Sequence, residues 1–214
     1  MNSGILCRGL TKAYGENVVL DGLDLDVAPG EFVALTSPSG GGKTTLLNVL
    51  GGLTTADRGR VHVAGSDLVR LGEDARAVLR RHRVGVVHQS SYLFPWLSVE
   101  ENLAMVPIRP GLETWSESVR RDLEVDRFRD TSTNKLSGGQ RRRVCLLRTL
   151  QGGPDVLLLD EPTTGLDEAL AVVVRDAVRA SADRGTAVLV ATHEPATVAV
   201  ADRTAVLAGK KVLA

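Results

Sequence analysis

The sequence predicts an α/β fold, with a parallel β-sheet covered by helices on both faces, from two observations. Apolar runs at 32–35, 84–87, 156–159 and 187–190 are continuous rather than alternating, which is typical of strands buried on both sides. Segments with helical character separate these runs along the chain. The 214 residues are enough for one large domain with a sizeable core.

The expected elements begin with two strands that differ from the rest. Residues 5–14 and 18–27 predict an antiparallel pair, which forms an N-terminal β subdomain. A strand at 32–36 then leads through a glycine-rich loop into a helix that starts near Lys43. Further helices are expected at 73–83, 98–105, 114–125, 138–152 and 168–184.

The middle of the chain is expected to form a separate helical subdomain. Residues from about 89 to 153 carry no strong strand pattern, so they are predicted to be a helical insert. The core with its β subdomain then covers about 1–88 and 154–214, within a single domain over 1–214. A last strand at 204–208 lies close to the end of the chain, leaving no room for a C-terminal regulatory domain.

Composition excludes several classes of protein. The 26 basic and 26 acidic residues balance, so net charge gives no attraction to nucleic acid or membrane. No signal peptide is recognisable, and no apolar run approaches the roughly 20 residues that span a bilayer. Cys7 and Cys145 have no metal-ligand spacing and suit a reducing compartment. We expect a soluble protein, or one held at a membrane only by partners.

A phosphate-binding loop is predicted between the strand at 32–36 and the following helix. Glycines at 40–42 let backbone N–H groups turn towards phosphate oxygens, and the helix N-terminus adds partial positive charge. Lys43 is expected to reach the β- and γ-phosphates of ATP, and Thr44 to ligate Mg²⁺. The nucleotide-binding set is Ser37, Pro38, Ser39, Gly40, Gly41, Gly42, Lys43, Thr44 and Thr45.

Ser37 stands where the phosphate-loop pattern has glycine. A serine in a backbone conformation that favours glycine would cost roughly 1–3 kcal/mol of strain. The alternative is a glycine-rich turn with a chance Lys-Thr pair. The order of strand, loop and helix favours the phosphate loop, and we expect ATP to bind despite Ser37.

Two carboxylates follow the apolar run at 156–159. Strand geometry is expected to point Asp160 and Glu161 to opposite sides. Asp160 is the candidate for holding Mg²⁺ through water, and Glu161 for polarising the water that attacks the nucleotide. An acidic turn after a strand is common by chance, so the phosphate loop upstream carries this interpretation.

Three further residues stand at strand ends. His193 is a candidate γ-phosphate sensor, although a lone histidine there is otherwise more often a capping or surface residue. Gln89 is placed at the carboxyl edge of the sheet, where ligands bind in open α/β sheets, and is a candidate hinge. Tyr14 is a candidate for stacking on adenine; otherwise it is a plain edge aromatic.

Residues 136–140 read Leu-Ser-Gly-Gly-Gln, and with the preceding residues they resemble the nucleotide-binding subunits of ABC transporters. The resemblance covers nearly the whole chain. The other matching residues are Tyr14, the phosphate loop, Gln89, Asp160-Glu161-Pro162, Gly165-Leu166-Asp167 and His193.

This resemblance implies a P-loop NTPase with a RecA-like core, working as half of a head-to-tail dimer. Each ATP would lie between the phosphate loop of one subunit and the signature of the other, formed by Ser137, Gly138, Gly139 and Gln140. Ser137 and Gly139 would donate to the γ-phosphate from the opposite subunit, and the N-terminus of their helix would face that anion.

The resemblance also implies roles for other residues and a place in the cell. Asp167 would cross the dimer interface and couple the two sites. Gln89 would contribute to Mg²⁺ binding and catalysis. Hydrolysis would drive a transmembrane permease from the cytoplasmic face of the membrane.

A narrower resemblance connects residues 97–103 and 192–195 to the lipoprotein-releasing, macrolide-exporting and cell-division ATPases. It favours an exporter, with residues 93–96 near the groove that receives the permease. Ser37 departs from the pattern, and the segment from Gln89 to Leu136 is shorter than expected for this group.

Two other functions use the same motifs. An ABC-type regulator, as in cell division, would transmit closure to a membrane protein without moving substrate. A soluble ABC protein of DNA repair or translation is disfavoured by the short insert, the single phosphate loop and the neutral charge. The basic run 141–143 is expected to be a helix face towards partners or solvent rather than a nucleic-acid patch.

Overall fold

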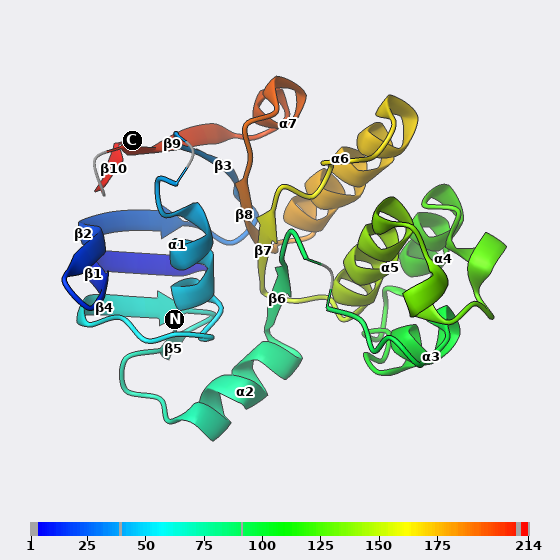
Figure 1. Ribbon diagram of the computed structural model, residues 1–214, viewed down its shortest axis with the longest axis horizontal. Helices are drawn as coiled ribbons and strands as arrows, with labels where there is room; N and C mark the ends of the chain where they lie inside the picture. The colour runs from blue at the N-terminus through cyan, green and yellow to red at the C-terminus, as the bar shows by residue number, and fades with distance from the viewer. Residues whose placement is uncertain (1–3, 39, 91, 209–210, 214) are drawn as a thin grey trace.

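The computed structural model describes residues 4–38, 40–90, 92–208 and 211–213, and it contains two β-sheets with helices around them (Figure 1). The predicted α/β class is confirmed. The larger sheet has the strand order β10-β9-β3-β8-β7-β6. Its strands are β3 (Phe32–Thr36), β6 (Val84–Val87), β7 (Val156–Asp160), β8 (Ala187–Ala191), β9 (Arg203–Ala208) and β10 (Lys211–Leu213).

Parallel pairing brings functional loops to one edge of this sheet. β3 pairs in parallel with both β8 and β9, and β7 pairs in parallel with β6 and β8. Only β10, which pairs antiparallel with β9, departs from this direction among the described strands. The loops that follow β3, β6, β7 and β8 therefore all leave from the same carboxyl edge, where ligands bind in such sheets.

The smaller sheet is antiparallel, with the order β2-β1-β4-β5. Its strands are β1 (Ile5–Tyr14), β2 (Asn17–Val27), β4 (Arg58–Val63) and β5 (Ser66–Asp67). The predicted pairing of the first two strands is confirmed. β4 and β5 were not expected, because β4 begins with exposed arginines around a glycine and β5 is too short to carry a pattern.

The helices divide between the sheets and a separate group (Figure 1). They are α1 (Lys43–Leu50), α2 (Glu73–His82), α3 (Val99–Ala104), α4 (Glu113–Asp122), α5 (Gly138–Gln151), α6 (Glu168–Asp183) and α7 (Pro195–Ala199), with 3-10 turns at Val125–Phe128 and Thr133–Lys135. α3, α4 and α5 gather on the side away from the antiparallel sheet. Among the described residues, no helix is both long and apolar enough to cross a bilayer.

The helices differ from the predicted ones at two places. The helix expected at 114–125 ends at Asp122, because Glu124 takes a left-handed conformation with φ of 55° that interrupts the helix. The short helix α7 was not expected; it begins at Pro195, whose fixed φ suits a first helical position.

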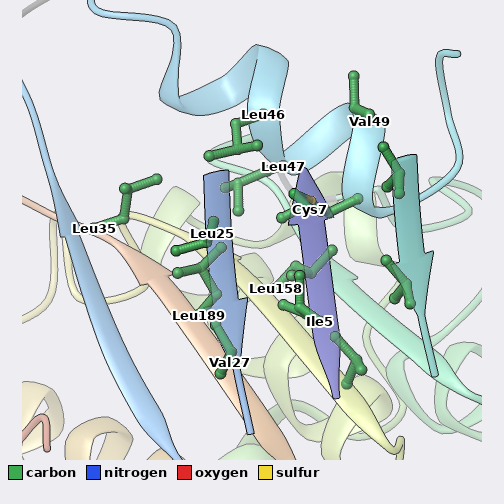
Figure 2. Close-up of a cluster of buried hydrophobic side chains, with 14 of the residues drawn as sticks. Ile5, Cys7, Leu25, Val27, Leu35, Leu46, Leu47, Val49, Leu158 and Leu189 are labelled. Atoms are coloured by element: carbon green, nitrogen blue, oxygen red, sulfur yellow. The ribbon is translucent and has the colours of Figure 1, made fainter. Parts of the chain in front are cut away.

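The core consists of two clusters on opposite faces of the parallel sheet. In β7, Leu158 joins the cluster that contains α1 and the antiparallel sheet, whereas Leu157 and Leu159 join the cluster under α5 and α6. Figure 2 shows the first cluster, with Leu46 and Leu47 of α1 above side chains from both sheets. This two-sided burial explains why the strand sequences are continuously apolar.

Both cysteines are free and buried, in different clusters. Burial raises the pKa of the Cys7 thiol to about 12 and also raises the pKa of Cys145. Both are therefore protonated packing residues at neutral pH.

Candidate functional site

The phosphate loop leaves the carboxyl end of β3 and enters α1. Gly40 and Gly42 have φ of 73° and 96°, which side-chain-bearing residues rarely adopt, so both need glycine for the backbone. Gly42 is the N-cap of α1 and brings no capping side chain, which leaves the first N–H groups of the helix available to an anion. Ser39 lies outside the described residues.

Lys43 turns back over its own loop. Its Nζ lies 3.1 Å from Ser37 Oγ and 3.3 Å from the Ser37 carbonyl oxygen. The expectation of a strained Ser37 is wrong, because Ser37 does not have positive φ; Ala64, Glu124 and Glu161 are the described non-glycine residues that do. The serine thus occupies the first position of the loop with ordinary backbone geometry.

Thr44 and Asp160 meet where α1 faces the end of β7. The Thr44 hydroxyl donates to Asp160 Oδ2 at 2.8 Å, and Asp160 is only 6% exposed. Both residues line a cavity of about 1010 Å³, together with Gln89. Carboxylate, hydroxyl and amide oxygens are hard donors, so this set fits the Mg²⁺ ion that the sequence predicted.

Glu161 and His193 form a direct contact, with Oε1 and Nδ1 2.7 Å apart. Glu161 follows β7 and takes φ of 50°, a left-handed conformation that costs a glutamate energy and is typical of functional sites. Its side chain is 12% exposed, whereas that of His193 is 77% exposed. The pair therefore joins a sheltered carboxylate to an imidazole that reaches the surface.

A hydrogen-bond network that the sequence did not suggest lies next to this pair. Glu194, directly after His193, accepts hydrogen bonds from Thr163 Oγ1 at 2.8 Å and from Arg175 at 3.2 Å, and also from Thr197. Arg175 is itself buried. The network ties the loop after β8 to the loop after β7, and no signal in the sequence could have paired residues so far apart.

The Leu-Ser-Gly-Gly-Gln segment forms the start of α5. Ser137 is the N-cap: its Oγ accepts from the Gln140 N–H at 3.2 Å, while Gln140 Oε1 accepts from the Ser137 N–H at 2.8 Å. This capping box holds the turn with local contacts only. Leu136 is buried beneath it, whereas Ser137 and Gly138 are exposed, so the helix N-terminus opens to solvent.

The signature lies apart from the phosphate loop in its own chain. Figure 1 shows α1 and α5 on opposite sides of β6 and β7. Between the signature and the described loop residues there is no hydrogen bond or ion pair. Gly139 instead approaches the turn at Gly165 and Leu166. The structure thus brings the loop, Asp160, Glu161, His193 and Gln89 to one sheet edge, but not the signature.

The remaining predicted residues have local partners. Tyr14 is 52% exposed, and Lys12 Nζ lies 5.3 Å from its ring centre, at the end of the β1–β2 hairpin. β2 passes directly beside Gly42, so the hairpin borders the phosphate loop. Asp167 caps α6 by accepting from Leu170 N at 2.9 Å.

The basic run 141–143 is not a free helix face. Arg143 is buried, and its guanidinium donates to the Leu123 carbonyl at 2.8 Å and stacks on Phe128. Arg142 donates to the Gln89 carbonyl at 3.1 Å. The expectation of a face towards solvent or partners is therefore wrong for Arg143, because its guanidinium contacts Leu123 and Phe128 of the same chain.

An aromatic and basic surface borders the cavity beside Gln89. Tyr92 lines the cavity and is exposed. Phe94 and Trp96, which follow it in the chain, do not line the cavity but are exposed, Trp96 to 73%. The same cavity is lined by Arg80, Arg81, Arg83 and Arg148, with Asp160 as its acidic residue among those described.

Comparison with known proteins places these features in a family. The family model described as "ABC transporter" matches residues 20–164. The chain is 38% identical to the lipoprotein-releasing system ATP-binding protein LolD of Pseudomonas syringae, over 97% of this chain and 96% of that protein. It is 34% identical to the macrolide export ATP-binding/permease protein MacB of Campylobacter jejuni, over 93% of this chain but 32% of that longer protein.

Two further similarities bear on the direction of transport and on the assembly of two ATP-binding domains. A probable anion import ATP-binding protein of Haloferax volcanii is 38% identical over 96% of this chain and 77% of that protein. A dimeric ATP-binding cassette in a post-hydrolysis state, bound to ADP and Pi, matches with a TM-score of 0.87 at 29% identity, over 98% of this chain and 97% of that one.

Proposed function

The chain belongs to the ABC transporter family as an ATP-binding, ATP-hydrolysing domain, and from this premise we propose that two copies pack head to tail as the motor of a membrane exporter. One observation carries the proposal: the two parts of an ATP site are present but lie apart in the chain (Figure 1). The exposed N-terminus of α5 has its capping box complete and an anion site free for another molecule. The dimeric cassette with 29% identity supports this arrangement.

The residues at the sheet edge divide the hydrolysis between them. Lys43 and the N–H groups around Gly42 bind the phosphates, and Thr44 and Asp160, with Gln89, would hold Mg²⁺, which neutralises phosphate charge when bound. Glu161 accepts a proton from water as the water oxygen bonds to the γ-phosphorus. The bond from that phosphorus to the bridging oxygen breaks, giving ADP and phosphate.

His193 orients Glu161 with one ring nitrogen and contacts the γ-phosphate with the other. Its Nδ1 contacts Glu161, and its Nε2 makes no hydrogen bond among the described residues. The exposed imidazole can therefore donate to the γ-phosphate with Nε2 while Nδ1 donates to Glu161, an arrangement in which both ring nitrogens carry hydrogen. Ser137 and Gly139 of the second copy would bind the same phosphate from the opposite side.

The exposed aromatic segment 92–96, together with the basic side of the cavity that Tyr92 lines, is the proposed docking place of a transmembrane permease. The arginines of that lining and the exposed Tyr92 and Trp96 suit a segment with acidic and apolar side chains. Arg142 links the signature helix to the Gln89 backbone, so closure of the dimer can move this surface. The similarity to LolD and MacB supports export, from the cytoplasmic face of the membrane.

A mixing experiment tests whether the ATP site is shared between copies. Lys43→Ala removes the loop cation, and Ser137→Ala removes the signature hydroxyl. A mixed dimer then holds one site with both groups intact and one with neither. Half of randomly paired dimers are mixed, so an equal mixture should regain about one quarter of the wild-type ATPase rate.

Each variant alone, at the same total concentration, is the control and should be nearly inactive. If the mixture is no more active than the single variants, while ATP-driven mixed dimers form, the proposal of a shared ATP site is wrong.

Purification of the chain from solubilised membranes tests whether it binds a permease. A co-purifying permease supports the role as a transporter motor, its similarity to exporter or importer permeases tests the direction of transport, and its loss on Trp96→Ala supports the docking place.

A further inference from the structure

We propose that Ser37 and Gly41 are an interlocked pair, in which the Ser37 side chain positions Lys43 for ATP and thereby requires glycine at position 41. Neither the serine at position 37 nor the glycine at position 41 is explained by the other contacts of the phosphate loop. This inference rests on the proposed nucleotide site.

Space, rather than backbone conformation, makes Gly41 necessary. A Cβ at Gly41 would lie 2.7 Å from Ser37 Oγ and 2.9 Å from Ser37 Cβ, distances that real Cβ atoms essentially never show. Gly41 does not have positive φ, whereas Gly40 and Gly42 on either side do. A Cβ at Gly40 would meet nothing within 4 Å. The three consecutive glycines therefore serve different purposes, and only Gly41 depends on what stands at position 37.

The Ser37 side chain uses the space that it takes. Its hydroxyl donates to the Pro38 carbonyl at 2.9 Å, and its oxygen lies 3.1 Å from Lys43 Nζ. The Gly41 N–H donates to the same Pro38 carbonyl at 3.0 Å. The Pro38 carbonyl thus accepts hydrogen bonds from both residues of the pair. The two Ser37 oxygens hold Lys43 Nζ against the start of the loop.

The pair explains how the chain tolerates a departure from the phosphate-loop pattern. The pattern requires glycine at the first position, where a side chain would crowd the loop. Here the added Cβ and hydroxyl fit because the fifth position has no side chain at all. Ser37 is a positioning residue, since it acts on ATP through Lys43.

The test is a set of four variants with ATP affinity measured by a fluorescent ATP analogue. Gly41→Ala forces its methyl group against Ser37 and should weaken binding by about tenfold or more. Ser37→Gly/Gly41→Ala removes both conflicting Ser37 atoms and should return affinity to within about threefold of wild type, since only the Pro38 oxygen at 3.0 Å must then shift slightly. Ser37→Ala/Gly41→Ala keeps the Cβ and should stay weak. Ser37→Gly alone frees Lys43 and should weaken binding by about threefold.

Gly72→Ala is the matched control, because Gly72 has no positive φ and a Cβ there meets nothing within 4 Å. It should leave affinity unchanged. The Gly41→Ala clash also costs stability, but Ser37→Gly should weaken binding while its unfolding temperature stays near that of wild type. A merely structural pair would instead lower the unfolding temperature in step with the loss of affinity. Absence of ATP binding by the wild type would overturn the proposed function itself. Wild-type binding with a harmless Gly41→Ala, or without rescue by Ser37→Gly, would overturn only the pair.

Discussion

The two parts of the ATP site are built in opposite ways. At the sheet edge, the metal-site and base residues are held by residues far away in the sequence: Thr44 by Asp160, and Glu161 by His193. The signature at the start of α5 is held by Ser137 and Gln140, three residues apart. The first part depends on the whole fold, whereas the second needs only its own helical turn.

This difference suits the two tasks. In the proposed dimer, the sheet edge must place a base, a loop cation and a metal site with fixed spacing, and a parallel sheet with both faces buried gives that rigidity. The proposed role of the signature is to approach an ATP on another copy and then leave it. A cap held by its own hydrogen bonds keeps its shape whether or not the second copy is present, because those bonds do not depend on the rest of the fold.

The largest expected effect separates chemistry from binding at the sheet edge. Glu161→Gln keeps the size of the side chain but cannot accept the proton of water. The ATPase rate should fall by about 10²–10⁴, while ATP still binds and the dimer accumulates. Rate measurements and size-exclusion chromatography with MgATP check both. Glu73→Gln on the exposed start of α2 is the control, and a Glu161→Gln protein with wild-type turnover would exclude Glu161 as the base.

A smaller effect tests whether the sheet edge depends on long-range contacts. Glu194→Gln replaces the charge that pairs with buried Arg175, so the free energy of unfolding should fall by about 1–3 kcal/mol. Urea denaturation measures this, and ATP hydrolysis should fall with it as His193 loses its support. Asp183→Asn, whose partner Arg179 is more exposed, should cost less.

The same substitution has a predictable pH dependence. Burial raises the pKa of Glu194, but hydrogen bonds from Thr197 and Thr163 and the charge of Arg175 outweigh it, so the pKa is lowered below its ordinary value of 4.5. A carboxylate with a lowered pKa stabilises the fold above its unfolded-state pKa, and this contribution is lost as pH falls through the folded-state value. The difference in unfolding free energy between wild type and Glu194→Gln should therefore be full at pH 7 and shrink below about pH 4.5. A difference that stayed constant into acid would show that the charge of Glu194 is not what stabilises the loop.

The contrast also explains what the sequence could predict. The capping box, the phosphate loop and the buried strands are local patterns, so residues 137–140, 40–44 and the runs of β3, β7 and β8 were assigned correctly to their elements. The Glu194 network and the Arg142 contact to Gln89 join distant residues, which no single-sequence pattern connects. β4 was not predicted, because its first residues are exposed arginines around a glycine and carry no apolar pattern.

Strain was expected at the wrong place for the same reason. The pattern pointed to Ser37 because glycine is usual there, but Ser37 does not have positive φ, and its side chain lies where it would clash with a Cβ at Gly41. The left-handed non-glycine residue among those described at the site is Glu161 instead. Its conformation depends on β7 ending beside β8, where the Glu161 N–H donates to the Ala191 carbonyl at 2.9 Å.

The smallest expected effect on stability tests the self-contained nature of the signature. Gln140→Ala removes half of the capping box and should lower the free energy of unfolding by about 0.5–1 kcal/mol. Gln140→Glu keeps an acceptor for the Ser137 N–H, so stability should stay near wild type. The added negative charge would nevertheless face the γ-phosphate of the other copy, and ATP-driven dimerisation should weaken more for Gln140→Glu than for Gln140→Ala. Urea denaturation and sedimentation with MgATP separate the two outcomes. Equal dimerisation by both variants would mean that position 140 serves only the helix cap, and that Ser137 and Gly139 alone meet the second nucleotide.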